Sequence, residues 1–272
     1  MKPDDAFLAR GGAQALRVTG KRKGLPFETQ DWVADEVPVA LEFNGISHAV
    51  MLATPLDLDD FALGFSLSEG ILSGPHELYG VEQEVSEAGI TLQLEVASGA
   101  FARLKDRRRT MAGRTGCGLC GTESLTQVAR QLPVLASGPV FRSEAVACAM
   151  NELRALQVLQ QATGAVHAAA WCAADGQVRL LREDVGRHNA LDKLVGALAI
   201  GGIAAGDGFI AVTSRASFEM VQKTVLAGAP LLAAISAATS LAAATAQASG
   251  LTLAGFVRDE DLVVYSHPER IA

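Results

Sequence analysis

The sequence is poor in cysteine and has fewer basic than acidic residues. Only four cysteines occur among 272 residues, and just Cys117 and Cys120 lie close together, which excludes a secreted domain stapled by disulfides. Lysine and arginine number 23, against 30 aspartate and glutamate residues, so the formal charge is −7. Because a phosphate backbone requires a basic footprint, we do not expect nucleic acid as a partner.

Long apolar targeting segments are also lacking. The first 20 residues mix acidic and apolar positions and do not resemble a signal peptide. Residues 224–257 carry no formal charge, and their length alone would permit a membrane span, but Pro230 interrupts them. Hydroxyl and amide side chains recur through the segment: Ser236, Thr239, Ser240, Thr245 and Gln247. We therefore expect a buried strand, helix and strand, no membrane partner, and a cytoplasmic protein with reduced thiols.

The first part of the chain is predicted to be rich in β-strand. Asn44-Gly45 separates two strand-like runs, which is the strongest short signal for a hairpin. The acidic residues Asp57, Asp59 and Asp60 favour the first turn of a helix that ends near Gly70. A second hairpin is predicted over residues 81–96, where apolar and polar residues alternate.

After about residue 139 the pattern changes to strands alternating with helices. The expected elements are a helix over 143–162, strands over 166–172 and 178–184, helices over 187–200 and 216–228, a strand over 208–214 between them, and then strand, helix, strand and strand. This order predicts an α/β fold with a mixed sheet and helices on both faces, preceded by a β-rich N-terminal region. The predicted division is 1–110, 111–135 and 136–272.

The pair Cys117-Gly-Leu-Cys120 is the sharpest chemical feature. It follows a segment, Arg103–Arg114, in which six basic residues and one acid give a local charge of +5. Nearby cations lower the pKa of a thiol and so favour the reactive thiolate. A structural zinc ion needs four ligands, often from a second close pair, which Cys148 and Cys172 do not form. We therefore predict reactive sulfur and no structural metal, with these other two cysteines buried as small apolar residues.

Two turns between a strand and a helix are candidates for binding an anion. Arg187 and His188 begin one helix, and Thr213, Ser214 and Arg215 precede another. Strand ends and helix N-termini are where anions bind in open α/β sheets, and a guanidinium recognises phosphate well. The alternative for the first turn is plain helix capping by Asp184 or Asn189. Lys223, two turns into the second helix, is expected in solvent.

Taken together, these segments resemble the formate dehydrogenase accessory sulfurtransferases, the FdhD family. The resemblance covers nearly the whole chain and rests on the order of these blocks: NGISHAVMLATPLDLDDFALGFSLSEGI, RTGCGLCG, TGAVHAAA, REDVGRHNALDKLVG, TSRASFEMVQKT, GAPLLAAISAATSLA and LTLAGFVR. A CxxC pair alone would be a weak signal, whereas the ordered set is specific.

The resemblance implies a function in sulfur transfer. A cysteine desulfurase would load sulfur on the loop as a persulfide, with Cys117 as carrier and Cys120 as its partner or an alternate carrier. The sulfur would pass to the molybdenum cofactor of formate dehydrogenase, a bis-molybdopterin guanine dinucleotide for which a guanine nucleotide is a mimic. By position, the cofactor would also contact the segment Phe256, Val257, Arg258, Asp259, Glu260 and Asp261.

The resemblance also implies a core similar to that of cytidine deaminases. Deaminase chemistry needs an H-x-E motif before P-C-x-x-C, whereas here the cysteine pair comes first and follows Gly116 rather than a proline. The alternatives that stay open are a chaperone that only holds the cofactor and, less favoured, a thiol–disulfide oxidoreductase. A homodimer also stays open.

Overall fold

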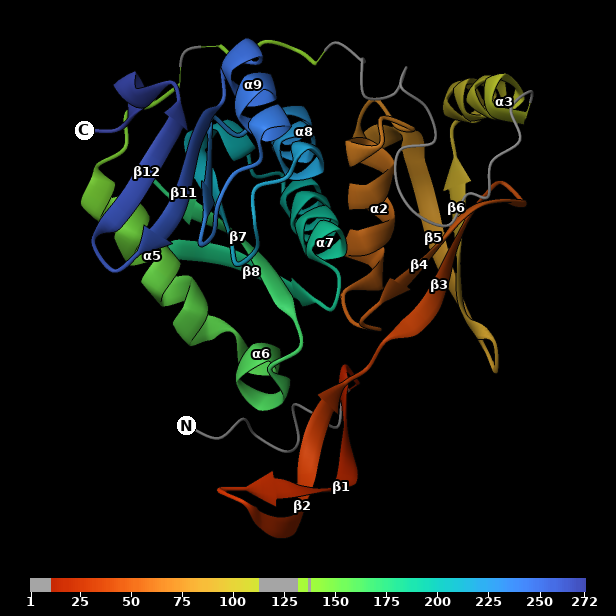
Figure 1. Cartoon of the computed structure of the whole chain (residues 1–272). Coiled ribbons are helices and arrows are strands. Elements are labelled where there is room, and N and C mark those ends of the chain that lie inside the picture. The colour runs from red at the N-terminus through yellow and green to blue at the C-terminus, as the bar shows by residue number, and fades with distance from the viewer. Residues whose placement is uncertain (1–10, 113–131, 137) are drawn as a thin grey trace.

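The computed structural model describes residues 11–112, 132–136 and 138–272, and the side chains of 107–112 are not among the described atoms. Cys117 and Cys120 lie outside the described residues, as does Arg114 at the end of the basic segment before them. Three sheets make up the described chain: a two-stranded ribbon, a four-stranded sheet and a six-stranded sheet (Figure 1).

The ribbon consists of β1 (Ala13–Arg22) and β2 (Leu25–Ala34), which pair in antiparallel register. It extends away from the rest of the molecule (Figure 1). Only its base is packed: Ala13 and Trp32 join a small apolar cluster with Leu159 and Val166. The remainder of the ribbon is largely exposed.

The four-stranded sheet has the order β4-β3-β6-β5, with β3 and β6 parallel and the other pairs antiparallel. Its strands are β3 (Val37–Phe43), β4 (Ile46–Ala53), β5 (Leu78–Ser86) and β6 (Gly89–Val96). Asn44 and Gly45 both adopt positive φ, 44° and 79°, the conformation of a two-residue hairpin turn. Both predicted hairpins are confirmed.

One face of this sheet is covered by α2 (Leu58–Ser68). The helix has Asp59 and Asp60 in its first turn and buries Phe61 and Phe65, so the predicted helix is confirmed. A short 3-10 turn (Pro75–Glu77) follows, and α3 (Ser98–Ala112) comes after β6. The helix α3 takes in most of the basic segment, for which the sequence analysis predicted no element.

The six-stranded sheet has the order β12-β11-β10-β9-β7-β8. Strands β9, β10 and β11 run parallel, while β7, β8 and β12 pair antiparallel with their neighbours. The strands are β7 (His167–Ala173), β8 (Val178–Asp184), β9 (Gly208–Val212), β10 (Leu231–Ala234), β11 (Thr252–Arg258) and β12 (Asp261–Ser266). The helices are α5 (Ser143–Leu156), α6 (Val158–Thr163), α7 (Arg187–Ile200), α8 (Phe218–Ala227) and α9 (Ser240–Ala248), with 3-10 turns at Ala205–Asp207 and Pro268–Arg270.

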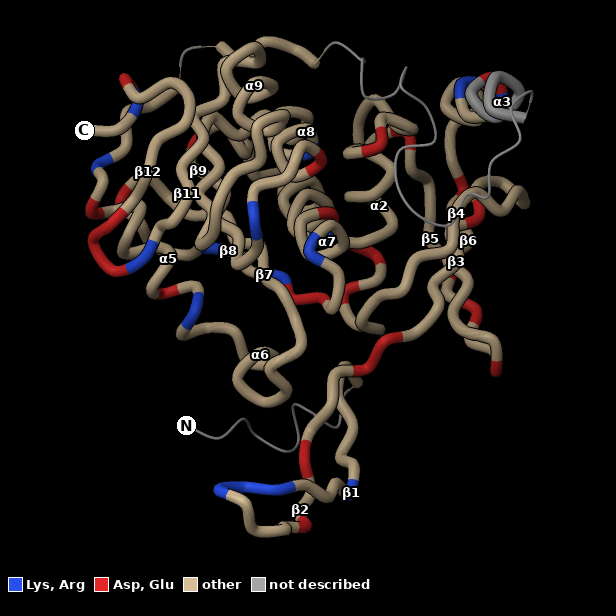
Figure 2. Tube along the Cα trace, viewed as in Figure 1, with Lys and Arg blue, Asp and Glu red and all other residues tan. Residues whose placement is uncertain are grey.

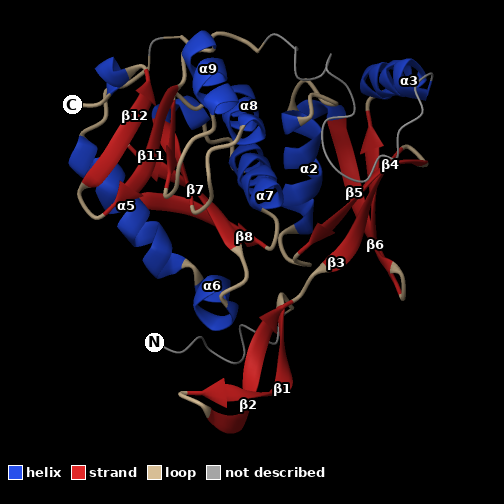
Figure 3. Cartoon of the chain, viewed as in Figure 1, coloured by secondary structure: helices blue, strands red, loops and turns tan. Residues whose placement is uncertain are grey.

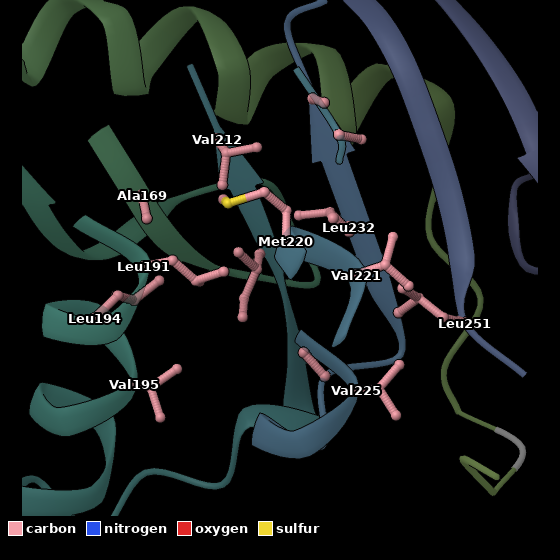
Figure 4. Close-up of a cluster of buried hydrophobic side chains, with 14 of the residues drawn as sticks. Ala169, Leu191, Leu194, Val195, Val212, Met220, Val221, Val225, Leu232 and Leu251 are labelled. Carbon is pink, nitrogen blue, oxygen red and sulfur yellow. The ribbon is translucent and has the colours of Figure 1, made fainter. Parts of the chain in front are cut away.

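Helices cover both faces of this sheet, as predicted. Helices α7, α8 and α9 lie on one face and α5 on the other (Figure 3). Leu191 and Leu194 of α7 meet Val221 of α8 over Val212 and Leu232 of the sheet (Figure 4). The uncharged segment 224–257 therefore spans the end of α8, β10, α9 and most of β11. Among the described residues, no helix combines the length and apolar character needed to cross a membrane.

The helix predicted over 143–162 is divided in the structure. Helix α5 ends at Leu156, and Gln157 leaves the helical region with ψ 89°. A new helix, α6, then begins, and the Glu183 carboxylate accepts hydrogen bonds from the amides of Leu159 and Gln160 at 2.9 and 3.0 Å. Because these amides have no partner inside their own helix, the carboxylate stabilises a second helix start at this point.

Helices α2 and α7 join the two larger sheets by lying side by side (Figure 1). A Cβ atom on Gly64 would overlap the carbonyl oxygen of Asp192, and one on Gly196 would overlap the carbonyl oxygen of Asp60. The helix backbones therefore touch directly at this glycine pair. The predicted division at residues 110 and 135 stays a prediction, while this contact ties the N-terminal region to the α/β core.

Candidate functional site

The parallel strands β9, β10 and β11 end at one edge of the six-stranded sheet. The loop Thr213–Ser217 follows β9, the loop 235–239 follows β10, and β11 reaches the same edge at Phe256. In open α/β sheets, ligands bind beyond the carboxyl ends of the strands. We call this edge the carboxyl edge.

Backbone hydrogen bonds hold the first two loops together. The Ala216 amide donates to the Ala237 carbonyl at 3.1 Å, and the Thr239 amide donates to the Ala216 carbonyl at 3.0 Å. Each loop leads directly into a helix whose N-cap is a hydroxyl residue, Ser217 or Thr239. Two helix N-termini therefore lie beside each other at the carboxyl edge, where their free amides favour an anion.

The end of β11 is fixed to the second of these loops, 235–239. The Phe256 amide donates to the Ser236 carbonyl at 3.1 Å, and Arg258 Nε donates to the Ile235 carbonyl at 3.1 Å. Gly255 is required here, because a Cβ atom would lie 2.8 Å from the Ser236 oxygen. The predicted segment 256–261 is thus the tip of the β11–β12 hairpin, and Arg258 is anchored at the carboxyl edge.

The residues at the hairpin tip differ in how far their side chains are exposed. Phe256 is 43% exposed, whereas Val257 is fully buried in the core against α5, so it can reach a ligand only through its backbone. The three acidic residues predicted with them are exposed in the turn and at the start of β12: Asp259, Glu260 and Asp261.

The turn before α7 reaches the same edge through the antiparallel strands. His167 at the start of β7 pairs with Asp184 at the end of β8, and the Ala168 amide donates to Thr213 Oγ1 at 2.8 Å. Arg187 and His188 are the first residues of α7, which begins two residues after the end of β8. The structure therefore brings both predicted anion turns and the hairpin tip to one edge.

Two buried polar atoms at this edge have no hydrogen-bond partner among the described residues: Arg187 Nε and His188 Nε2. His188 Nε2 lies 3.9 Å from the Glu219 carboxylate, which is too long for a hydrogen bond. Burial, together with the charges of Arg187 and Lys223, lowers the pKa of His188 to about 4. At neutral pH the imidazole is therefore uncharged. Buried polar atoms without a partner cost free energy unless a ligand pairs with them. The Arg187 guanidinium, and the imidazole in its Nε2–H tautomer, can both donate to an anionic group.

The capping expected at the α7 turn is also present. Asp184 Oδ1 accepts hydrogen bonds from the Gly186 amide at 2.7 Å and from Asn189 Nδ2 at 3.0 Å. Its other oxygen lies 2.7 Å from Lys193 Nζ, and both side chains of this ion pair are fully buried. Asp184 therefore satisfies the turn and leaves the side chains of Arg187 and His188 available.

Lys223 lies behind the site and is buried, so the expectation that it lies in solvent is wrong. Its ammonium contacts Asp192 and Glu69, each at 2.9 Å, and Ser68 Oγ at 2.9 Å. Burial alone would lower the pKa of Lys223, but the two carboxylates outweigh it and raise the pKa. Lys223 was misplaced because its partners Ser68 and Glu69 come from the end of α2, far from α8 in the sequence.

The two remaining cysteines differ. Cys172 is fully buried on β7, and burial raises the pKa of its thiol far above the ordinary value, which confirms the prediction of an inert core residue. Cys148 is exposed on α5, so the prediction that it is buried is wrong. The helical face that packs on the sheet is formed by its neighbours Val146, Ala149 and Met150, which leaves Cys148 on the solvent side.

Sequence reasoning missed Ser217, Glu219 and the loop 235–239 at this site. A signal was present, because both loops follow a buried apolar strand and end in a hydroxyl residue at a helix start. Among the described residues, no group of three or more histidine, cysteine, aspartate or glutamate side chains is placed to hold a metal ion.

The fold and this edge define the class: an α/β protein with a mixed sheet whose polar groups converge beyond the parallel strand ends. The model of the FdhD/NarQ family matches residues 34–272, and the chain belongs to this family. It is 68% identical over 271 residues to the "Sulfur carrier protein FdhD" of Variovorax paradoxus (strain S110), covering 100% of this chain and 98% of that protein.

Other known proteins agree with this assignment. A protein of the same name from Cupriavidus necator is 59% identical over 250 residues, covering 92% of this chain and 87% of that protein. The fold is similar to the crystal structure of a protein described as a formate dehydrogenase accessory protein from Desulfotalea psychrophila. The TM-score is 0.76 at 24% identity, over 96% of this chain and 99% of that one.

Proposed function

We propose that this protein is a sulfur carrier, a sulfurtransferase required for formate dehydrogenase activity. The observation that carries this proposal is the 68% identity, along the whole chain, to a protein named as a sulfur carrier. The residues that would do the chemistry are Cys117 and Cys120, which the basic segment precedes.

The proposed sulfur path uses both cysteines. The Cys117 thiolate takes the outer sulfur of a desulfurase persulfide, which leaves the desulfurase as a thiolate and Cys117 as a persulfide. Attack of the Cys120 thiolate on the inner sulfur then releases the outer sulfur as sulfide and forms a Cys117–Cys120 disulfide. The two thiols supply the two electrons, so a cellular thiol reductant must restore the pair after each transfer.

The proposed acceptor is the molybdenum cofactor, bis-molybdopterin guanine dinucleotide, as a substrate rather than a resident group. Its phosphates need hydrogen-bond donors and cations, and the carboxyl edge offers Arg187, Arg215 and Arg258. The unpaired atoms Arg187 Nε and His188 Nε2 support the same placement. Thr213 and Ser214 lie in the same loop, although the Ser214 hydroxyl donates to the Arg215 carbonyl at 3.1 Å.

The proposed partners follow from this path. A cysteine desulfurase donates the sulfur, and formate dehydrogenase receives the sulfurated cofactor. All three proteins would meet in the cytoplasm, where thiols stay reduced.

The decisive experiment loads the protein with a desulfurase and isotopically labelled cysteine and then maps bound sulfur by mass spectrometry. We expect an added mass of about 32 Da, one sulfur atom, on Cys117 or Cys120, and loss of the label in the Cys117→Ser, Cys120→Ser double variant. Cys148→Ser is the matched control, because Cys148 is an exposed thiol, and buried Cys172 should stay unlabelled. Label confined to Cys148, or none at all, would favour a chaperone that only holds the cofactor.

A further inference from the structure

A fully buried ion pair lies behind the turn that begins α7. Asp184 at the end of β8 and Lys193 on α7 are both 0% exposed, and their charged groups are 2.7 Å apart. Figure 2 shows basic, acidic and again basic positions along the chain where β8 leads into α7. A buried ion pair adds little net stability, because both charges lose their hydration, but it can select one arrangement of the groups bonded to it.

Each oxygen of the Asp184 carboxylate has two donors, and the four donors come from different parts of the chain. Oδ1 accepts hydrogen bonds from the Gly186 amide at 2.7 Å and from Asn189 Nδ2 at 3.0 Å. Oδ2 accepts one from the Thr54 amide at 3.0 Å and contacts Lys193 Nζ at 2.7 Å. A carboxylate has about four acceptor positions, so this one cannot turn without breaking a hydrogen bond.

The two residues bonded to Oδ1 flank the candidate anion-binding side chains. Gly186 stands directly before Arg187, and Asn189 stands directly after His188. A Cβ atom on Gly186 would lie 2.8 Å from Asn189 Nδ2, so this close approach requires glycine. Arg187 and His188 are thus held on both sides by one carboxylate, which is itself fully buried and out of reach of a ligand.

The turn is also tied to the end of β4. Thr54 is fully buried directly after that strand, and its amide is the one that donates to the carboxylate. Its hydroxyl accepts a hydrogen bond from the Val185 amide at 3.2 Å, and its carbonyl accepts one from Lys193 Nζ at 2.9 Å. The Leu52 carbonyl accepts another from Asn189 Nδ2 at 2.8 Å. The four-stranded sheet therefore fixes where the turn lies at the carboxyl edge.

We propose that Asp184, Asn189 and Thr54 are positioning residues of the anion site. They hold Arg187 and His188 so that the guanidinium and the imidazole face one phosphate group, and none of the three touches the ligand. This inference rests on the proposed function for the identity of that ligand. Donors that are aimed before binding favour the complex, because no free energy is then spent on ordering them.

Substitutions in the full chain test this role, with guanosine diphosphate as the probe and isothermal titration as the measurement. Asn189→Ala removes two hydrogen bonds of the turn and leaves the ion pair in place, so it should weaken binding at least about fivefold. Thr54→Val keeps the shape of the side chain but loses the bond to the Val185 amide, and should also weaken binding. Thr54→Ser, which keeps the hydroxyl, should bind as wild type does.

The His188 imidazole gives a second readout that needs no ligand. Burial and the charges of Arg187 and Lys223 lower its pKa to about 4, against the opposite influence of Glu219 and Glu69. When the turn loosens in the alanine variant, the ring reaches solvent, and its pKa should rise toward the ordinary value of 6.5. Titration of the ¹⁵N-labelled histidine rings by NMR measures this change.

Leu153→Ala is the control for a general loss of stability. Leu153 is fully buried on α5, on the opposite face of the six-stranded sheet, so its cavity lowers the melting temperature and should leave nucleotide binding and the His188 pKa unchanged. Wild-type affinity in Asn189→Ala overturns the proposal, and so does an equal loss of affinity in Leu153→Ala. Failure of the wild type to bind the nucleotide contradicts the proposed function instead, and an unchanged His188 pKa in Asn189→Ala would then overturn the positioning role.

Discussion

The two larger sheets are built in opposite ways. The six-stranded sheet has helices on both faces, and its polar groups converge at the carboxyl edge, where Arg187 and His188 meet the loop after β9. The four-stranded sheet has α2 on one face and exposes glutamates and apolar residues on the other. A sheet that is covered twice can present a ligand site only at its edge, whereas a half-covered sheet presents a broad surface.

The two sheets therefore present different surfaces to a ligand or partner. The carboxyl edge has the donors and helix N-termini that suit a phosphate-bearing ligand, whereas the uncovered face of the four-stranded sheet carries exposed apolar and acidic side chains. The contact between α2 and α7 joins the two sheets. We therefore expect the largest losses of stability from variants that disrupt this contact.

Removing Lys223 should have the largest effect on stability. Lys223→Ala leaves Asp192, which is 1% exposed, as a buried charge without its partner, and breaking such a pair costs about 3–5 kcal/mol. Urea unfolding followed by fluorescence measures this loss. Lys105→Ala is the control: its ammonium lies 4.1 Å from the Phe101 ring centroid at an exposed position, a contact worth about 0.5–1 kcal/mol. Equal losses in the two variants would contradict the account of the junction.

The glycine pair should come next. Gly64→Ala or Gly196→Ala forces the two helices apart, because the added methyl group meets a backbone carbonyl, and such overpacking costs about 1–3 kcal/mol. Gly99→Ala in α3 is the matched helical control, because the nearest atom to its Cβ is the flexible end of Arg103 at 3.7 Å. That variant should be neutral or slightly stabilising. The melting temperatures of all three variants separate the effect of the steric clash from the effect of helix propensity.

Much of the fold follows from local pattern. The helix predicted over 187–200 matches α7, and the Asn44-Gly45 turn was predictable because two residues with positive φ strongly select these side chains. The mixed sheet was predictable from the alternation of strands and helices after residue 139. The core face of α2 follows from the spacing of its apolar residues, whereas α7 is buried from Asn189 to Leu198 without a break.

The site was only partly predictable, because its members come from separate strands. Arg187, His188 and Arg215 could be proposed from turns, whereas the loop 235–239 joins them only through pairing of β10 with β9. Lys223 was assigned to solvent because its partner Glu69 lies 154 positions away in the chain. Long-range pairing of charges leaves no trace in the spacing of nearby residues.

The measurement that tests the central claim most directly is guanine nucleotide binding at the carboxyl edge. Isothermal titration with guanosine diphosphate should show that Arg187→Ala and Arg215→Ala each weaken binding about tenfold, the loss of one charge-assisted contact, while loading of sulfur by the desulfurase is unchanged. Arg179→Ala, an exposed arginine near the start of β8, should bind as wild type does. Wild-type affinity in both edge variants would contradict the placement of the anion site, even if the cysteines carry sulfur.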